Sequence, residues 1–153
     1  METEIPQAAD QRPLTPYLVV RNAANTIEFY SAVFGAVEQF RLSETSGKIG
    51  HAELAIGPAR LMLADEYPDF GALGPISVGG TPVGLHLYVG DADATVALAI
   101  ERGATLLRPV KDEFYGDRVG VIVDPFGHRW QIATRKLLLS PQEMQERWSA
   151  MMQ

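Results

Sequence analysis

Two of the three histidines lie in strand-like segments whose residue types could carry acid–base or metal chemistry. In the run HAEL, His51 and Glu53 are two residues apart, and this spacing in an extended strand places both side chains on one face. A histidine beside a carboxylate can move protons or bind a metal ion. The alternative is a solvated or cross-strand polar pair without chemistry. In either case Ala52 and Leu54 are expected in the core.

His86 is the histidine that we expect to face a pocket. It lies inside the run GLHLYV, where strand alternation places the neighbouring leucines on the buried side and His86 on the other. There it could act as a base, a metal ligand or a hydrogen-bond donor to a ligand, or it could be a hydrogen-bonded structural histidine near Tyr88. His128, in the tight turn PFGH, is expected to brace that turn, and Asp124 to cap its free N–H groups.

An arginine and several tyrosines could complete a binding surface. Arg118, in the run YGDR, could hold an anionic group in a fork geometry, or it could form an ion pair with Asp112 or Asp117. Tyrosine rings form amphipathic pocket walls. The predicted ligand-binding residues are Tyr17, Met62, His86, Tyr88, Tyr115, Arg118 and Gln131.

The composition indicates one globular domain and excludes several classes of function. The chain has 153 residues, of which 46% are hydrophobic and 21% charged, enough for a core. The net charge of −6 argues against nucleic acid or an anionic membrane as partner, because both bind basic patches. The absence of cysteine excludes disulfides, Cys-ligated zinc and iron–sulfur clusters. No apolar leader or membrane-spanning run is present, so we expect a cytoplasmic protein.

The elements that would position these residues occur twice. Segments 17–40 and 87–110 each begin with an apolar run, followed by an Asn or Asp suited to capping a helix and then a helical pattern. Each pattern ends at a glycine, Gly35 or Gly103. Strand-like runs follow at 37–42, 50–56 and 59–64 in the first half and at 105–109, 118–124 and 130–134 in the second. The pattern therefore predicts the order strand, helix, strand, strand, strand in each half. The similarity indicates an internal duplication; the alternative is that any two strand–helix units look alike.

This pattern predicts an α+β fold of two tandem βαβββ modules with a C-terminal helix. The expected segments are a flexible N-terminal segment (1–13), module one (14–66), a Gly/Pro-rich linker (67–82), module two (83–136) and the helix (137–153). The helix begins with a capping box, in which Ser140 is the N-cap and Pro141 the first helical residue. Its apolar face predicts docking onto this chain or onto a second copy; it consists of Met144, Trp148 and Met151.

Three segments resemble the vicinal oxygen chelate superfamily, and most nearly its PhnB-like branch: TPYLVVRNAANTIEFYSAVFGA, GLHLYVGDADATVALAIERGATLLRPV and YGDRVGVIVDPFGHRWQIATRK. That superfamily includes glyoxalase I, bleomycin-resistance proteins, fosfomycin-resistance enzymes and extradiol dioxygenases. The resemblance covers 14–136 and implies a glyoxalase-like fold, in which curved mixed sheets enclose a cavity and paired modules often form a homodimer. It places the metal-ligand positions of the superfamily on Thr15, Met62, Gly84 and Gln131.

These four residues depart from a metal-binding pattern. A thioether is too soft for the hard metals of such enzymes, glycine has no side chain, and one amide does not hold a divalent ion. We therefore predict no cofactor. A divalent metal remains possible at a fallback site made of His51, Glu53, His86 and Gln131.

The sequence favours a metal-independent protein that binds an aromatic or partly cationic small molecule in the cavity, as a homodimer. The alternative is a superfamily enzyme of the lyase, isomerase, dioxygenase or transferase type. Such an enzyme would use His86 with a divalent metal or as a general base. A third hypothesis is a scaffold that acts through protein–protein contact, for which the C-terminal helix is the only support.

Overall fold

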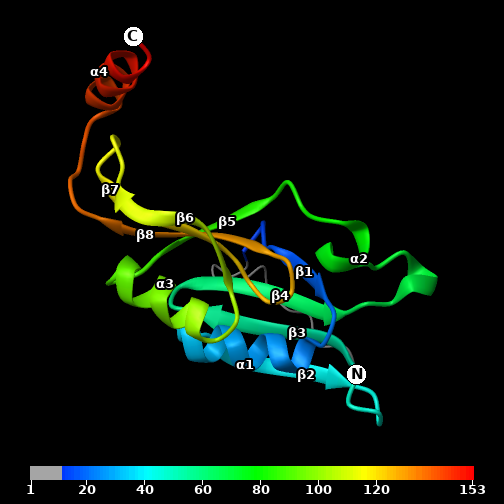
Figure 1. Cartoon of the computed structure of the whole chain (residues 1–153). Coiled ribbons are helices and arrows are strands. Elements are labelled where there is room, and N and C mark those ends of the chain that lie inside the picture. The colour runs from blue at the N-terminus through cyan, green and yellow to red at the C-terminus, as the bar shows by residue number, and fades with distance from the viewer. Residues whose placement is uncertain (1–11) are drawn as a thin grey trace.

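Each half of the chain folds into one strand, one helix and three further strands (Figure 1). A computed structural model describes residues 12–153, so most of the predicted N-terminal segment lies outside the described residues. Module one comprises β1 (Tyr17–Val20), α1 (Ala23–Phe34), β2 (Val37–Ser43), β3 (Ile49–Ile56) and β4 (Ala59–Asp65). Module two comprises β5 (Gly84–Tyr88), α3 (Ala92–Glu101), β6 (Thr105–Asp112), β7 (Asp117–Val123) and β8 (Arg129–Arg135). The short helices η1 (Pro68–Phe70) and α2 (Pro75–Val78) lie between the modules, and α4 (Pro141–Met151) follows them.

Each module forms a four-stranded mixed sheet, with the strands in the order β1-β4-β3-β2 or β5-β8-β7-β6. The first strand pairs in parallel with the last, and the other pairs are antiparallel. Tyr17 lies opposite Met62 in the first sheet, as His86 lies opposite Gln131 in the second. The two modules therefore have the same strand order and the same register, which confirms the predicted α+β repeat.

The helix ends are set by local residues. The Asn22 side chain accepts a hydrogen bond from the backbone N–H of Asn25 at the start of α1, and the Asp91 side chain does the same at α3. Gly35 ends α1 with a φ of 70°, a left-handed conformation that costs glycine little. At α4 the Ser140 hydroxyl accepts from the N–H of Glu143, as the capping box predicts.

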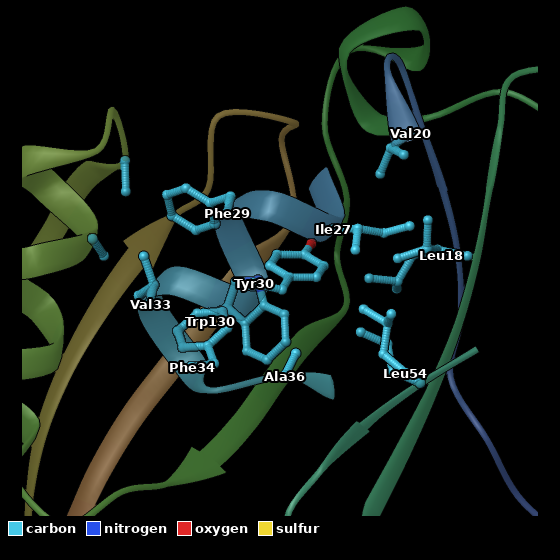
Figure 2. Close-up of a cluster of buried hydrophobic side chains, with 14 of the residues drawn as sticks. Leu18, Val20, Ile27, Phe29, Tyr30, Val33, Phe34, Ala36, Leu54 and Trp130 are labelled. Carbon is cyan, nitrogen blue, oxygen red and sulfur yellow. The ribbon is translucent and has the colours of Figure 1, made fainter. Parts of the chain in front are cut away.

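One hydrophobic core joins the two modules. Trp130 of β8 is 3% exposed, and its ring centroid lies 4.4 Å from that of Phe34 and 5.2 Å from that of Tyr30, both on α1 (Figure 2). Leu18 and Leu54 of the first sheet belong to the same cluster. The helix-facing sides of both sheets are therefore buried together.

A buried carboxylate reinforces this junction. Asp124 accepts hydrogen bonds from the Tyr30 hydroxyl at 2.5 Å and from the indole N–H of Trp130 at 2.9 Å. It also accepts from the backbone N–H groups of Phe126 and His128, which confirms the predicted turn cap. Because Tyr30 comes from module one, Asp124 ties the modules together as well as its own turn.

His128 and the turn before it contact the opposite module. Its Nε2 lies 3.1 Å from the backbone oxygen of Val19, so it braces β1 in addition to its turn. A side chain at Gly127 would meet Pro75 of α2 at 2.8 Å, so the linker packs closely over this turn. Among residues 12–153, no helix is long and apolar enough to cross a membrane.

The sheet sides turned away from this core remain open to solvent. We call the side of β1-β4-β3-β2 that carries Tyr17 the first open face, and the side of β5-β8-β7-β6 that carries His86 the second open face. Tyr17 is 50% exposed and Tyr88 on the second face is 49% exposed. Because the helix-facing sides share one core, the two open faces do not close on each other within one chain.

Candidate functional site

On the first open face a tyrosine, a histidine and a glutamate form a hydrogen-bonded chain. The Tyr17 hydroxyl lies 2.8 Å from His51 Nδ1, and His51 Nε2 lies 2.9 Å from Glu53 Oε2. The register explains the meeting: Tyr17 and Glu53 are both partners of Met62, one on each side of β4. His51 then reaches across from β3, and its ring also contacts Phe40 at a centroid distance of 5.7 Å.

The chemistry of the three groups orders their protons. An ionised carboxylate only accepts hydrogen bonds, so Nε2 of His51 donates to Glu53. In a neutral imidazole the other nitrogen, Nδ1, is then an acceptor for the Tyr17 O–H. Partial burial, followed by the charge of Glu53, raises the pKa of Tyr17, so this phenol holds its proton at rest.

The second open face carries a different network. The Tyr88 hydroxyl donates to Asp117 Oδ2 at 2.6 Å, and Arg135 Nη2 donates to the Tyr88 oxygen at 2.9 Å. Asp117 is 4% exposed and also pairs with Arg135 at 3.7 Å. The His86 ring lies 4.8 Å from the Tyr88 ring in an edge-on contact, and the exposed His86 side chain makes no hydrogen bond to residues 12–153. His86 therefore lies near Tyr88 but is not a hydrogen-bonded structural histidine, and its role as a base, ligand or donor stays a prediction.

A cavity of about 250 Å³ lies against this face, between the sheet and α4. Arg147 of α4 donates to the backbone oxygen of Phe114 at 3.2 Å, and the ring centroids of Trp148 and Phe114 are 5.5 Å apart. The C-terminal helix thus supplies one wall. The cavity is lined by Arg108, Glu113, Phe114, Tyr115, Val119, Val121, Gln131, Trp148 and Met151.

The charges around this cavity act on Tyr115. Burial raises the pKa of its hydroxyl most, Glu113 and Asp117 raise it further, and the positive charge of Arg108 opposes them. Glu113 is paired with Lys111 at 3.8 Å, whereas the Arg108 side chain makes no hydrogen bond or ion pair with the described residues. Arg108 is therefore the available cation at the cavity.

A wider hollow of about 440 Å³ lies beside α2, lined largely by small and apolar residues such as Pro75, Ile76 and Leu107. It contains no histidine, tyrosine or carboxylate, and it borders the second open face through Val123 and Arg129. We therefore place the candidate site at the Tyr17–His51–Glu53 chain and at the cavity under α4, where histidine, tyrosine and carboxylate groups lie.

The structure distributes the predicted binding residues over both faces. Tyr17 and Met62 lie on the first open face, and Tyr115 and Gln131 line the cavity on the second. For Arg118 the structure shows the ion-pair alternative with Asp112 in place of the ligand-binding role.

Arg118 pairs with Asp93 of α3 at 2.7 Å and with Asp112 at 3.2 Å, on the helix side of β7. Its fork is thus occupied by two carboxylates, and it does not line the cavity. Asp117, the other partner considered for Arg118, pairs with Arg135.

Sequence reasoning missed Arg108, Phe114 and Trp148 as cavity residues. The apolar face of the C-terminal helix was a signal for Trp148, since it predicted docking. The sequence did not show where that helix would dock.

The residues at the superfamily's metal positions do not fit a divalent ion. Met62 offers a thioether, Gly84 has no side chain, and Gln131 offers one amide. The fallback residues are divided, with His51 and Glu53 on one sheet and His86 and Gln131 on the other. Within 12–153 no group of three or more His, Asp or Glu side chains could hold a metal ion.

Comparisons with known proteins agree with this architecture. A family model described as the Glyoxalase/Bleomycin resistance protein/Dioxygenase superfamily matches residues 9–132. An uncharacterized protein of Mycobacterium tuberculosis is 44% identical over 122 residues, which cover 78% of this chain and 72% of that protein. A solved structure from Arabidopsis thaliana is 25% identical with a TM-score of 0.65, covering 80% of this chain and 98% of that one. The fosfomycin resistance protein FosX from Listeria monocytogenes shares the fold alone, with a TM-score of 0.62 at 14% identity over 88% of this chain and 98% of its own. The chain belongs to the glyoxalase/bleomycin resistance protein/dioxygenase superfamily.

Proposed function

We propose that the chain binds a small aromatic molecule, without a metal ion, in the cavity between the second open face and α4. The observation that carries this proposal is the aromatic wall of Phe114, Tyr115 and Trp148 around that cavity. Aromatic side chains favour planar ligands, which they contact by stacking or edge-on. The volume of about 250 Å³ is somewhat below that of typical drug-sized pockets and suits a ligand of one or two rings.

The charge around the cavity indicates the polar group of the ligand. Arg108 is exposed and without an ion-pair partner in 12–153, whereas Glu113 is already opposed by Lys111. A carboxylate on the ligand would pair with the guanidinium in a charge-assisted hydrogen bond. We therefore favour an aromatic acid over the partly cationic ligand that the sequence suggested.

We also propose that the chain forms a homodimer. The edge strands carry exposed large apolar side chains, Phe40 and Leu42 on β2 and Leu106 and Leu107 on β6. Unpaired, apolar edges favour association with another chain, and a homodimer would cover them and close the open faces. Sedimentation equilibrium tests this point: a monomer at micromolar concentration would contradict the dimer and leave the cavity under α4 intact.

Tryptophan fluorescence tests the binding site directly. Trp148 lies in the cavity wall and is 46% exposed, whereas Trp130, the other tryptophan, is buried in the core. Titration with 2-naphthoate should change the Trp148 emission saturably, and Trp148→Phe should abolish the change. EDTA should have no effect.

The role of the Arg108 charge in binding is tested separately. Arg108→Gln should weaken the binding of 2-naphthoate about tenfold. This change corresponds to the loss of one charge-assisted contact of about 1.4 kcal/mol. The uncharged analogue 2-naphthalenemethanol should bind the wild type and Arg108→Gln equally. Equal naphthoate affinity in both proteins, or an unchanged signal in Trp148→Phe, would contradict the proposed site.

A further inference from the structure

We propose that Tyr17, His51 and Glu53 form a metal-free proton relay on the first open face, through which the Tyr17 hydroxyl exchanges a proton with a bound small molecule. This inference concerns a catalytic site, goes beyond binding at the cavity under α4, and does not depend on it. The two hydrogen bonds, of 2.8 and 2.9 Å, run without a break from the phenol through the imidazole to the carboxylate.

The internal repeat shows that the fold does not require these polar groups. Gln131 is paired with His86 and Val121, as Met62 is paired with Tyr17 and Glu53. The place of Glu53 is therefore taken by Val121 in module two, and the place of His51 by Val119, two residues earlier. Because module two forms the same sheet with two valines there, the histidine and glutamate of module one are not needed to build it.

The setting of the relay suits proton transfer. Tyr17 is half-exposed, so a ligand on the first open face can contact it beside its hydroxyl. The side chains of His51 and Glu53 are 22% and 28% exposed, and the Phe40 ring shields the imidazole on one side. Partial exclusion of water strengthens the attraction between an imidazolium and a carboxylate.

Every proton in the proposed transfer has a donor and an acceptor. A ligand C–H proton moves to the Tyr17 oxygen while the Tyr17 proton moves to Nδ1 of His51, and Glu53 stabilises the imidazolium that forms. The electron pair of the broken C–H bond stays on the ligand. Return of the proton to another ligand atom gives an isomer, without an oxidant, a reductant or a co-reactant. The substrate class is therefore a carbon acid, a molecule whose C–H bond is acidified by an electron-withdrawing neighbour.

The elimination of 5-nitrobenzisoxazole tests the relay with a defined carbon acid. A base removes the proton on carbon 3, the N–O bond breaks, and the coloured 2-cyano-4-nitrophenolate forms from the same atoms. Tyr17→Phe and His51→Gln should each lower the protein-dependent rate about 100-fold, the scale of general-base catalysis. Glu53→Gln should lower it by about tenfold, because it removes the charge that orients and stabilises the imidazole. Glu101→Gln, at the end of α3 in the other module, is a matched control for Glu53→Gln and should retain the rate.

A structural measurement separates the relay from a passive polar cluster. Ring-nitrogen NMR should find the His51 proton on Nε2 in the wild type, and circular dichroism should show that each variant is folded. A proton on Nδ1 would overturn the proposal, because that nitrogen could then not accept from Tyr17. A wild-type rate in Tyr17→Phe would also overturn it, as would a wild-type protein no faster than its His51→Gln variant. Binding of 2-naphthoate beside Trp148 is measured on the other face, so neither proposal's failure would imply the other's.

Discussion

Removal of one hydroxyl, in Tyr30→Phe, should weaken the junction between the modules by about 2 kcal/mol. Tyr30 is fully buried and its hydroxyl donates to Asp124 at 2.5 Å. A hydrogen bond to a charged group contributes about 1.5–3 kcal/mol, and phenylalanine fills nearly the same volume. Asp124 keeps three other donors, so the carboxylate is not left unpaired. For a chain of this length, the loss should lower Tm by about 6 °C.

The same variant predicts a specific dependence on pH. Burial, followed by the charge of Asp124, raises the pKa of Tyr30 well above its ordinary value near 10. The folded state therefore keeps the Tyr30 proton where the unfolded state loses it. The stability contributed by this group is present below pH 10 and is lost as the pH rises through the folded pKa. Each pH unit above 10 removes about 1.4 kcal/mol of the stability that Tyr30 contributes to the wild type, a loss that Tyr30→Phe does not have.

Urea unfolding followed by circular dichroism measures both effects. At pH 8 the wild type should exceed Tyr30→Phe by about 2 kcal/mol, and at pH 11 the difference should be smaller by about 1.4 kcal/mol. Other tyrosines titrate equally in both proteins and cancel in the difference. A difference that stays constant from pH 8 to pH 11 would show that Tyr30 is not held protonated, and the description of the junction would then be wrong.

Two further predictions concern packing and the C-terminal helix. Gly120→Ala should cost about 1–3 kcal/mol in urea unfolding, because the new methyl group would meet Val110 at 2.6 Å and Val96 at 3.1 Å. The matched variant Gly90→Ala, with no atom within 4 Å of its Cβ, should change stability by less than about 1 kcal/mol, and equal losses would contradict the packing argument. Trp148→Ala should shift the unfolding free energy by less than about 0.5 kcal/mol, because α4 has no buried residue. A larger shift would mean that α4 stabilises the fold as well as lining the cavity.

The fold was predictable because its signals are local. Caps, terminal glycines and strand alternation each act over a few residues, and they place α1, α3, α4 and most strands correctly, whereas η1 and α2 lie in the segment expected to be a linker. β6 is the instructive exception, since Pro109 suggested an end and the strand continues to Asp112. β6 is an edge strand with an irregular register between Arg108 and Lys111, so a residue without an N–H is tolerated there.

The candidate site was predictable only where it is local as well. His51 and Glu53 meet because they are two residues apart on one strand, and this spacing is visible in the sequence. Tyr17 joins them through the register of three strands, across 34 residues of chain. The pairing of Arg118 with Asp93 was not predictable for the same reason, because Asp93 becomes a neighbour only when α3 packs on β7.

The repeat offers a way to separate structural positions from functional ones without any other sequence. Positions that both modules fill with buried or partly buried leucine, such as Leu18 and Leu87, face the shared core in matching registers. Positions on the open faces differ in chemistry between the modules, as His51 differs from Val119. Both sheets form with the same strand order, so these differences are not demanded by folding. Function is therefore expected on the open faces, and each module supplies the control for the other: a polar group that its counterpart replaces by valine can be removed with little effect on the sheet.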